Sequence, residues 1–191
     1  HATHMDADEY RRAALSGAVA GLCPTTEANL GDGIFDMAQW RAGRGHWGVG
    51  SDSHATVNAA EELLMLEYSQ RLATRQRNVL AGDRHAYVAT AMTLDAVAGG
   101  AQASGRAVAG LAVGQQADLV VLDAEHPLLQ GLPTADAVLS AHVFASHRQS
   151  AIAEVWVSGQ ARVSAGRHAS NPSARAAFNT ARRQLLETTH P

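Results

Sequence analysis

A short apolar run that ends in a carboxylate, residues 47–52 (WGVGSD), constrains the fold more than any other stretch of the chain. Its length and its closing glycine and serine predict a buried strand that stops at a turn. Asp52 then lies at the carboxyl end of the strand, where α/β barrels carry their catalytic groups. The alternative is that Asp52 only caps the next helix, since Gly-Ser-Asp-Ser is also favourable turn chemistry.

Helical and strand patterns alternate through the first 105 residues, which is typical of parallel βα units. Asn58 and Glu61 have the spacing of a capping box at the start of the most regular helix. In the helix after it, Leu94, Val97 and Ala98 are expected to face inward. The predicted helices span residues 6–16, 34–42, 58–78 and 85–103, the predicted strands span 18–23 and 47–50, and residues 25–33 are predicted to be a polar loop.

The pattern changes after residue 105, where strands follow one another without alternating helices. Residues 117–123 predict a strand with β-branched residues at its centre. Residues 152–163 alternate apolar and polar side chains on either side of a turn at Gly159, which predicts a hairpin. Residues 174–188 predict a final amphipathic helix.

Histidine and aspartate side chains carry the candidate chemistry. Asp52 could ligate a divalent metal and accept a proton from its bound water, whose pKa zinc lowers from about 15.7 to roughly 7. His1 could be a metal ligand, a general acid or base beside the metal, or an ordinary exposed residue. The 25–33 loop could contact a polar substrate or simply connect a strand to a helix. Cys23 is expected to be buried and inert, without a histidine partner.

Charge and cysteine content restrict the partners. The net charge is −3 with no basic stripe, so nucleic acid is not favoured. No apolar run approaches the roughly 20 residues that a membrane-spanning helix needs. The single cysteine excludes an intrachain disulfide and favours the cytoplasm. A small-molecule substrate is therefore the expected partner.

Four segments together resemble the metal-dependent deaminases of the amidohydrolase superfamily: residues 1–4 (HATH), 23–35 (CPTTEANLGDGIF), 50–54 (GSDSH) and 114–123 (GQQADLVVLD). Within that superfamily the 23–35 segment is most similar to the formimidoylglutamate deiminases of histidine degradation. The resemblance covers nearly the whole chain. The GSD piece is shared widely, whereas the 23–35 run is far more specific.

The resemblance implies a mixed α/β fold in which residues 1–105 form the carboxyl-terminal part, about strands six to eight, of a (β/α)₈ barrel. Residues 106–168 would belong to a flanking β-sandwich, and residues 169–191 would form a terminal helix. It also implies one zinc ion, with Asp52 as a ligand and the other ligands elsewhere. Because the chain starts without a methionine inside what looks like an active-site turn, we expect a longer protein whose amino-terminal part completes the site.

The implied reaction is hydrolysis of N-formimidoyl-L-glutamate to N-formyl-L-glutamate and ammonia. Asp52 would accept a proton from the attacking water, His1 would be catalytic, and Glu27 and Asn29 would contact the substrate. The 191 residues alone are expected to be inactive, and a homodimer is a candidate assembly because dimers are common among such barrels. Two alternatives stay open: a related deaminase that acts on a purine-like ring, and a non-catalytic assembly domain in which Asp52 caps a helix.

Overall fold

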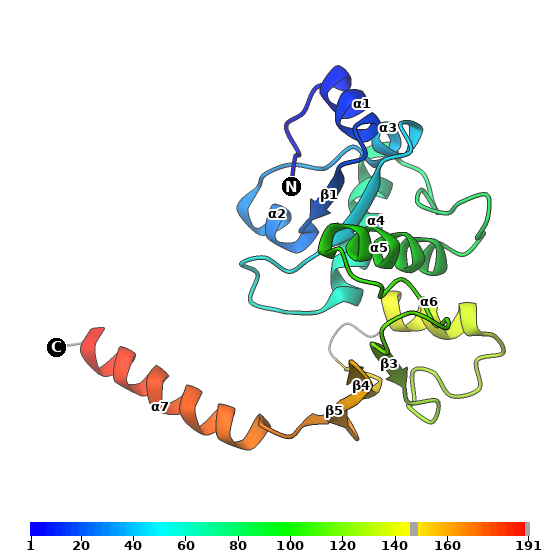
Figure 1. Ribbon diagram of the computed structural model, residues 1–191. Coiled ribbons are helices and arrows are strands. Elements are labelled where there is room, and N and C mark those ends of the chain that lie inside the picture. Colours follow the sequence, from blue (N-terminus) through cyan, green and yellow to red (C-terminus); the bar gives the residue numbers. More distant parts are fainter. Residues whose placement is uncertain (146–148, 190–191) are drawn as a thin grey trace. The chain divides into compact units, whose positions relative to one another are not determined.

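The computed structural model describes residues 1–145 and 149–189, and these residues divide into two compact units (Figure 1). Unit 1 comprises His1–Gln116 and Ala124–Ser150, and unit 2 comprises Ala117–Asp123 and the chain from Ala151 onward. Within the described ranges, no helix combines the length and apolar character that crossing a membrane requires.

Unit 1 is built around two parallel strands, β1 (Val19–Leu22) and β2 (His46–Val49), which pair from Val19 opposite His46 to Leu22 opposite Val49. The Gly50 N–H donates to the Leu22 carbonyl oxygen at 2.9 Å and extends the pairing. Both carboxyl ends therefore lie at the same edge. The helices of unit 1 are α1 (Ala7–Leu15), α2 (Pro24–Leu30), α3 (Met37–Ala42), α4 (Ala59–Thr74), α5 (Val88–Ser104) and α6 (Ala135–Phe144).

Helix caps explain where α1 and α4 begin. The Asp6 side chain accepts hydrogen bonds from the first turn of α1, and the Asp6 N–H donates to the Glu9 carboxylate, which completes a capping box. Asn58 caps α4 as predicted, by accepting from the Ala60 N–H at 3.0 Å. Helix α4 ends at Thr74, four residues before the predicted end, because Arg75 adopts a left-handed conformation.

The 25–33 segment corrects a prediction, because its first part is helix α2 rather than loop. Pro24 occupies the first turn, where its missing N–H costs nothing. Cys23, at the N-cap position, offers no side-chain hydrogen bond. The carboxylate of Glu62, on α4, instead accepts from the Thr25 N–H and the Thr25 hydroxyl. A long-range contact thus supplies the cap that the local sequence lacks.

The core of unit 1 contains aromatic side chains from α1, α3 and the segment between α2 and α3. Phe35 packs edge-to-face on Tyr10 and Trp40, with ring centroids 5.1 and 5.5 Å apart. Helix α5 approaches β2 so closely that a Cβ at Gly99 would lie 1.9 Å from the Trp47 carbonyl oxygen. Any larger residue at Gly99 would therefore push α5 away from the strand that leads to Asp52.

The predicted inward face of α5 is wrong. Leu94 and Val97 are exposed, whereas Met92 and Gly99 are buried. Leu94 follows Met92 by two residues, which places it about 200° away around the helix. Because the close contact at Gly99 fixes which side of α5 meets β2, Leu94 and Val97 point elsewhere.

Unit 2 is an antiparallel sheet followed by a helix. Strands β3 (Leu119–Leu122), β4 (Ile152–Val157), β5 (Gln160–Ser164) and β6 (Arg167–His168) lie in the order β3-β4-β5-β6. The β4–β5 pair confirms the hairpin predicted around Gly159. Helix α7 (Asn171–Thr189) closes the described chain and begins three residues earlier than predicted.

The compact units differ in extent from the segments predicted from the sequence. Residues 106–116 and 124–150, which we assigned to the flanking β-sandwich, cluster with unit 1. The segment includes α6, a helix that we did not predict, whose Phe144 ring stacks on Tyr68 of α4. Packing of α6 against α4 and α5, rather than sheet formation, decides where these residues belong.

Candidate active site

The two strand ends of unit 1 place Cys23 and Asp52. Cys23 directly follows β1, and Asp52 lies three residues beyond β2. Asp52 adopts φ of 46°, in a turn where the His54 N–H donates to the Ser51 carbonyl oxygen. The Thr26 hydroxyl of α2 donates to the same oxygen at 2.8 Å and ties the turn to α2. Parallel pairing therefore brings residues 29 positions apart in sequence to one edge.

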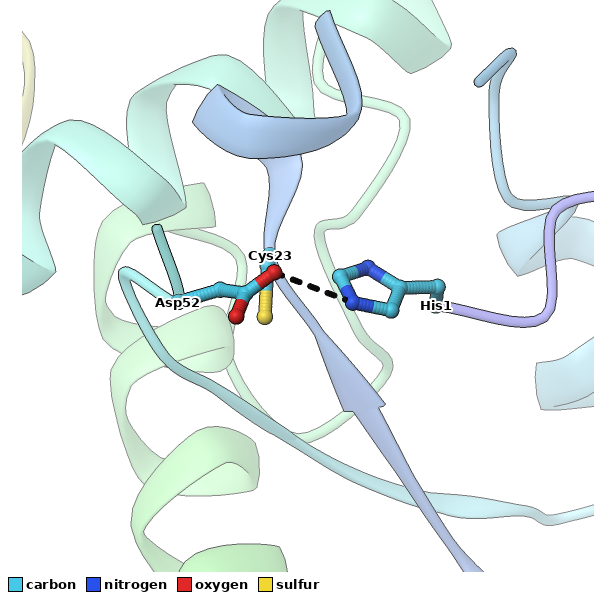
Figure 2. Close-up of side chains that lie close together, drawn as sticks. All are labelled: His1, Cys23 and Asp52. Atoms are coloured by element: carbon cyan, nitrogen blue, oxygen red, sulfur yellow. Dashed lines mark ion pairs between the residues drawn. The ribbon is translucent and has the colours of Figure 1, made fainter. Parts of the chain in front are cut away.

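His1 reaches this edge from the start of the chain. Its backbone nitrogen donates to the Gly21 carbonyl oxygen at 2.6 Å, which places it alongside β1. Its ring Nε2 lies 3.2 Å from Oδ2 of Asp52 (Figure 2). The structure thus brings together the two residues that the sequence singled out as catalytic.

Glu27 contacts the other nitrogen of the same ring. Its Oε1 lies 3.2 Å from His1 Nδ1 and accepts the Cys23 N–H at 2.9 Å. Glu27 is only 4% exposed, and this burial raises the pKa of its carboxyl group, opposed mainly by the hydrogen bond from Cys23. The sequence predicted that Glu27 contacts the substrate; in the structure its side chain lies against His1 and the start of α2.

The ring of His1 therefore lies between two carboxylates, and this arrangement restricts its hydrogen bonding. If Nδ1–H donates to Glu27, the neutral ring presents a lone pair at Nε2 toward an oxygen of Asp52. Two acceptors at 3.2 Å repel each other unless a proton or another cation lies between them. The pair can thus share a proton or jointly hold a positive ion.

Cys23 is a member of this cluster, contrary to the prediction that it has no histidine partner. A His1 ring nitrogen, the Cys23 sulfur and an Asp52 oxygen all lie within 4.8 Å of one another (Figure 2). The half-buried thiol has a raised pKa, first because of burial and then because of the nearby Asp52 and Glu27 carboxylates. Cys23 follows a predicted strand just as Asp52 does, so the same strand-end pattern could have identified it.

Other polar candidates lie outside this cluster. Asn29, predicted to bind substrate, is exposed near the end of α2. His4 is also exposed. His54, which we considered because it follows Asp52 closely, contacts the Thr56 hydroxyl at 2.7 Å.

Glu62, a buried carboxylate on α4, supports the site and was not among the residues predicted from the sequence. Glu62 is 1% exposed and holds the first turn of α2, which carries both Cys23 and Glu27. Its partners are the N–H and hydroxyl of Thr25. In the sequence, Glu62 is an acidic residue in the first turn of a predicted helix, as is Glu61. The neighbouring residues therefore do not show which of the two is buried.

Comparisons with known proteins identify the family of the chain. A family model described as "Amidohydrolase family" matches residues 1–162. The chain is 45% identical over 187 residues to the formimidoylglutamate deiminase of Pseudomonas aeruginosa, covering 98% of this chain and 41% of that protein. The chain therefore spans about two fifths of the length of this relative.

Solved structures show the same fold. The crystal structure of an amidohydrolase from Brucella melitensis superposes with a TM-score of 0.88 at 44% identity, covering 97% of this chain and 40% of that one. An adenosine deaminase from Xanthomonas campestris with bound zinc superposes with a TM-score of 0.81 at 20% identity, covering 98% and 42%. Because the identity to this adenosine deaminase is only 20%, the comparison supports a shared fold and nothing more.

Proposed function

Because the chain belongs to the amidohydrolase family, we propose that the polypeptide containing it hydrolyses N-formimidoyl-L-glutamate to N-formyl-L-glutamate and ammonia. The observation that carries the proposal is the meeting of His1 and Asp52, 3.2 Å apart, at the carboxyl ends of parallel strands. The 45% identity to a formimidoylglutamate deiminase supports the choice of substrate. We place the reaction in histidine degradation and in the cytoplasm.

Asp52 is the residue of this chain that would hold the family's zinc ion. The donor set fits, since the Asp52 side chain is 43% exposed and lies beside an imidazole at the strand edge. We propose that β1 and β2 are the seventh and eighth barrel strands, that His1 follows the sixth, and that the remaining ligands precede His1. A zinc ion bound there would activate a water molecule for attack on the amidine carbon.

The residues of this chain would orient groups and move protons. Asp52 accepts the proton that the attacking water loses, because its carboxylate lies at the open edge of the site. His1 orients the nucleophile through Nε2, while Glu27 holds Nδ1 and fixes the ring. We propose that Glu27 is a positioning residue, and that Asn29, exposed on the same helix, is the remaining candidate in α2 for contacting the substrate.

The test is ammonia release from N-formimidoyl-L-glutamate by the complete, zinc-replete polypeptide. Asp52→Asn should lower kcat/KM by about 10² to 10⁴-fold, the range expected for loss of a general base. Asp8→Asn is the matched control, since this exposed carboxylate of α1 pairs with Arg11 and Arg12. It should leave kcat/KM within about twofold of wild type, as expected for an exposed surface change.

Two outcomes would refute the proposal. Turnover of a purine without turnover of formimidoylglutamate would assign the site to a ring deaminase. A polypeptide that binds no zinc after metal-replete purification, with Asp52→Asn silent, would identify a non-catalytic assembly domain.

A further inference from the structure

We propose that His1, Cys23 and Asp52 form a binding site for a thiophilic divalent cation, such as Zn²⁺ or Cd²⁺, in which the Cys23 thiolate is a ligand. The three residues present a ring nitrogen, a sulfur and a carboxylate oxygen, all within 4.8 Å of one another (Figure 2). Nitrogen, sulfur and oxygen donors in one cluster suit borderline and soft metals, whereas magnesium and calcium prefer oxygen alone.

The distances are close to those that such an ion requires. Zinc bonds of roughly 2.0–2.3 Å in a tetrahedron place neighbouring donor atoms about 3.3–3.7 Å apart. The His1–Asp52 pair already lies at 3.2 Å. The Cys23 sulfur therefore has to approach by no more than about 1.5 Å, which is within reach of a side-chain rotation.

Surrounding contacts hold two of the donors in place for this role. Glu27 contacts Nδ1 of His1, so Nε2 is the nitrogen presented to Asp52. A carboxylate on the far nitrogen of a histidine is the usual outer contact of a metal-bound imidazole. Glu27 also accepts the Cys23 N–H, which fixes the backbone from which the thiol projects. One buried carboxylate thus orients two of the three ligands.

Occupation of this site would regulate the reaction proposed above, and this part of the inference rests on that proposed function. A cation bound by His1 and Asp52 engages both side chains that would handle the water molecule. The Cys23 proton passes to solvent as the sulfur binds. Excess thiophilic cation should therefore inhibit the deiminase, and the inhibition should depend on Cys23.

Cobalt titration of the 191-residue chain tests the binding site directly. Cys23 is the only cysteine in the sequence, so a sulfur-to-cobalt charge-transfer band can arise from no other residue. Wild type should develop this band at about one equivalent of Co²⁺, and Cys23→Ser should lack it. His1→Gln and Asp52→Asn should each weaken binding by about tenfold or more. His4→Gln, an exposed histidine three residues from His1, is the matched control and should leave binding unchanged.

Two results would overturn the site. One is the absence of the band in a chain whose circular dichroism shows helices and strands. The other is a band of undiminished affinity in both His1→Gln and Asp52→Asn, since the thiol would then bind cobalt without the cluster.

A parallel assay on the complete polypeptide separates the regulatory claim from the proposed function. Cd²⁺ in excess of the zinc should inhibit ammonia release by wild type, and Cys23→Ser should need about tenfold more Cd²⁺ for the same inhibition, as loss of one ligand predicts. Equal inhibition of both would refute regulation through Cys23. A cobalt band without any deiminase activity would leave the cation site standing and refute the proposed function instead.

Discussion

Units 1 and 2 are held together in different ways. Unit 1 buries large aromatic and aliphatic side chains together with Glu27, Glu62 and Glu67. Among the described residues of unit 2, Ala151 alone is buried, and the strand residues Val120 and Val121 remain exposed. Unit 2 thus depends chiefly on hydrogen bonds between strands, whereas unit 1 depends on a packed interior.

The difference shows why the candidate site lies in unit 1. A buried carboxylate is tolerated where hydrogen-bond donors satisfy it, and a packed interior holds such donors in fixed positions. Glu67 accepts from Arg71 and from two backbone N–H groups, and Glu62 accepts twice from Thr25. The packing of unit 1 holds the donors that satisfy these carboxylates. It also fixes the positions of the strand ends and of α2 around His1.

The largest expected difference between the units concerns two phenylalanines. Phe35→Ala should lower the free energy of unfolding by about 3–5 kcal/mol, because Phe35 is 1% exposed and packs between Tyr10 and Trp40. Phe178→Ala on α7 should change it by no more than about 0.5 kcal/mol, because this ring is 62% exposed. Urea denaturation of the two variants measures both values, and similar losses would contradict the comparison.

The next largest loss in the free energy of unfolding is expected from removing a buried carboxylate. Glu62→Ala leaves the Thr25 N–H and hydroxyl without their partner, so we expect a loss of about 1–3 kcal/mol in the free energy of unfolding. Its control is Glu61→Ala, the neighbouring acidic residue in the first turn of α4, which should cost less than about 1 kcal/mol. Equal costs would mean that Glu62 does not cap α2.

Glu27→Gln tests whether the buried polar groups of unit 1 serve the site. If Glu27 positions His1, its replacement should lower kcat for formimidoylglutamate by about 10 to 100-fold with little change in KM. Leu30→Ala, at an exposed position of the same helix, should leave kcat unchanged. A rise in KM for Glu27→Gln at constant kcat would instead favour the direct substrate contact that the sequence predicted.

The smallest expected effect is on how the free energy of unfolding changes with pH, and it arises from a histidine in unit 1. Burial lowers the pKa of His142, on α6, below its ordinary value of 6.5. The unfolded chain therefore binds more protons than the folded chain between that value and the folded pKa. The free energy of unfolding should thus fall as the pH drops below 6.5, and His142→Gln should flatten this decline. Denaturation at pH 7.5 and 5.5 would measure it, and identical slopes would exclude His142 as the cause.

Sequence patterns predicted the parts of the site that depend on local order along the chain. The apolar run before Asp52 predicted a strand, and the structure contains β2 there. Asn58 predicted the start of α4 because a cap acts within one helical turn. Helix α2 could not be predicted in this way, because its cap comes from Glu62, 37 residues away from Thr25.

The sequence by itself determined that Asp52 follows a strand and that the family motifs lie in residues 1–54 and 114–123, because both depend on the order of neighbouring residues. Only the tertiary structure decided that Cys23 joins His1 and Asp52, and that Glu27 faces the His1 ring rather than open solvent. The physical reason is that parallel pairing of β1 with β2 joins chain segments that local patterns cannot relate. Each buried carboxylate of unit 1 has hydrogen-bond partners, because burying an unpaired charge would destabilise the folded state.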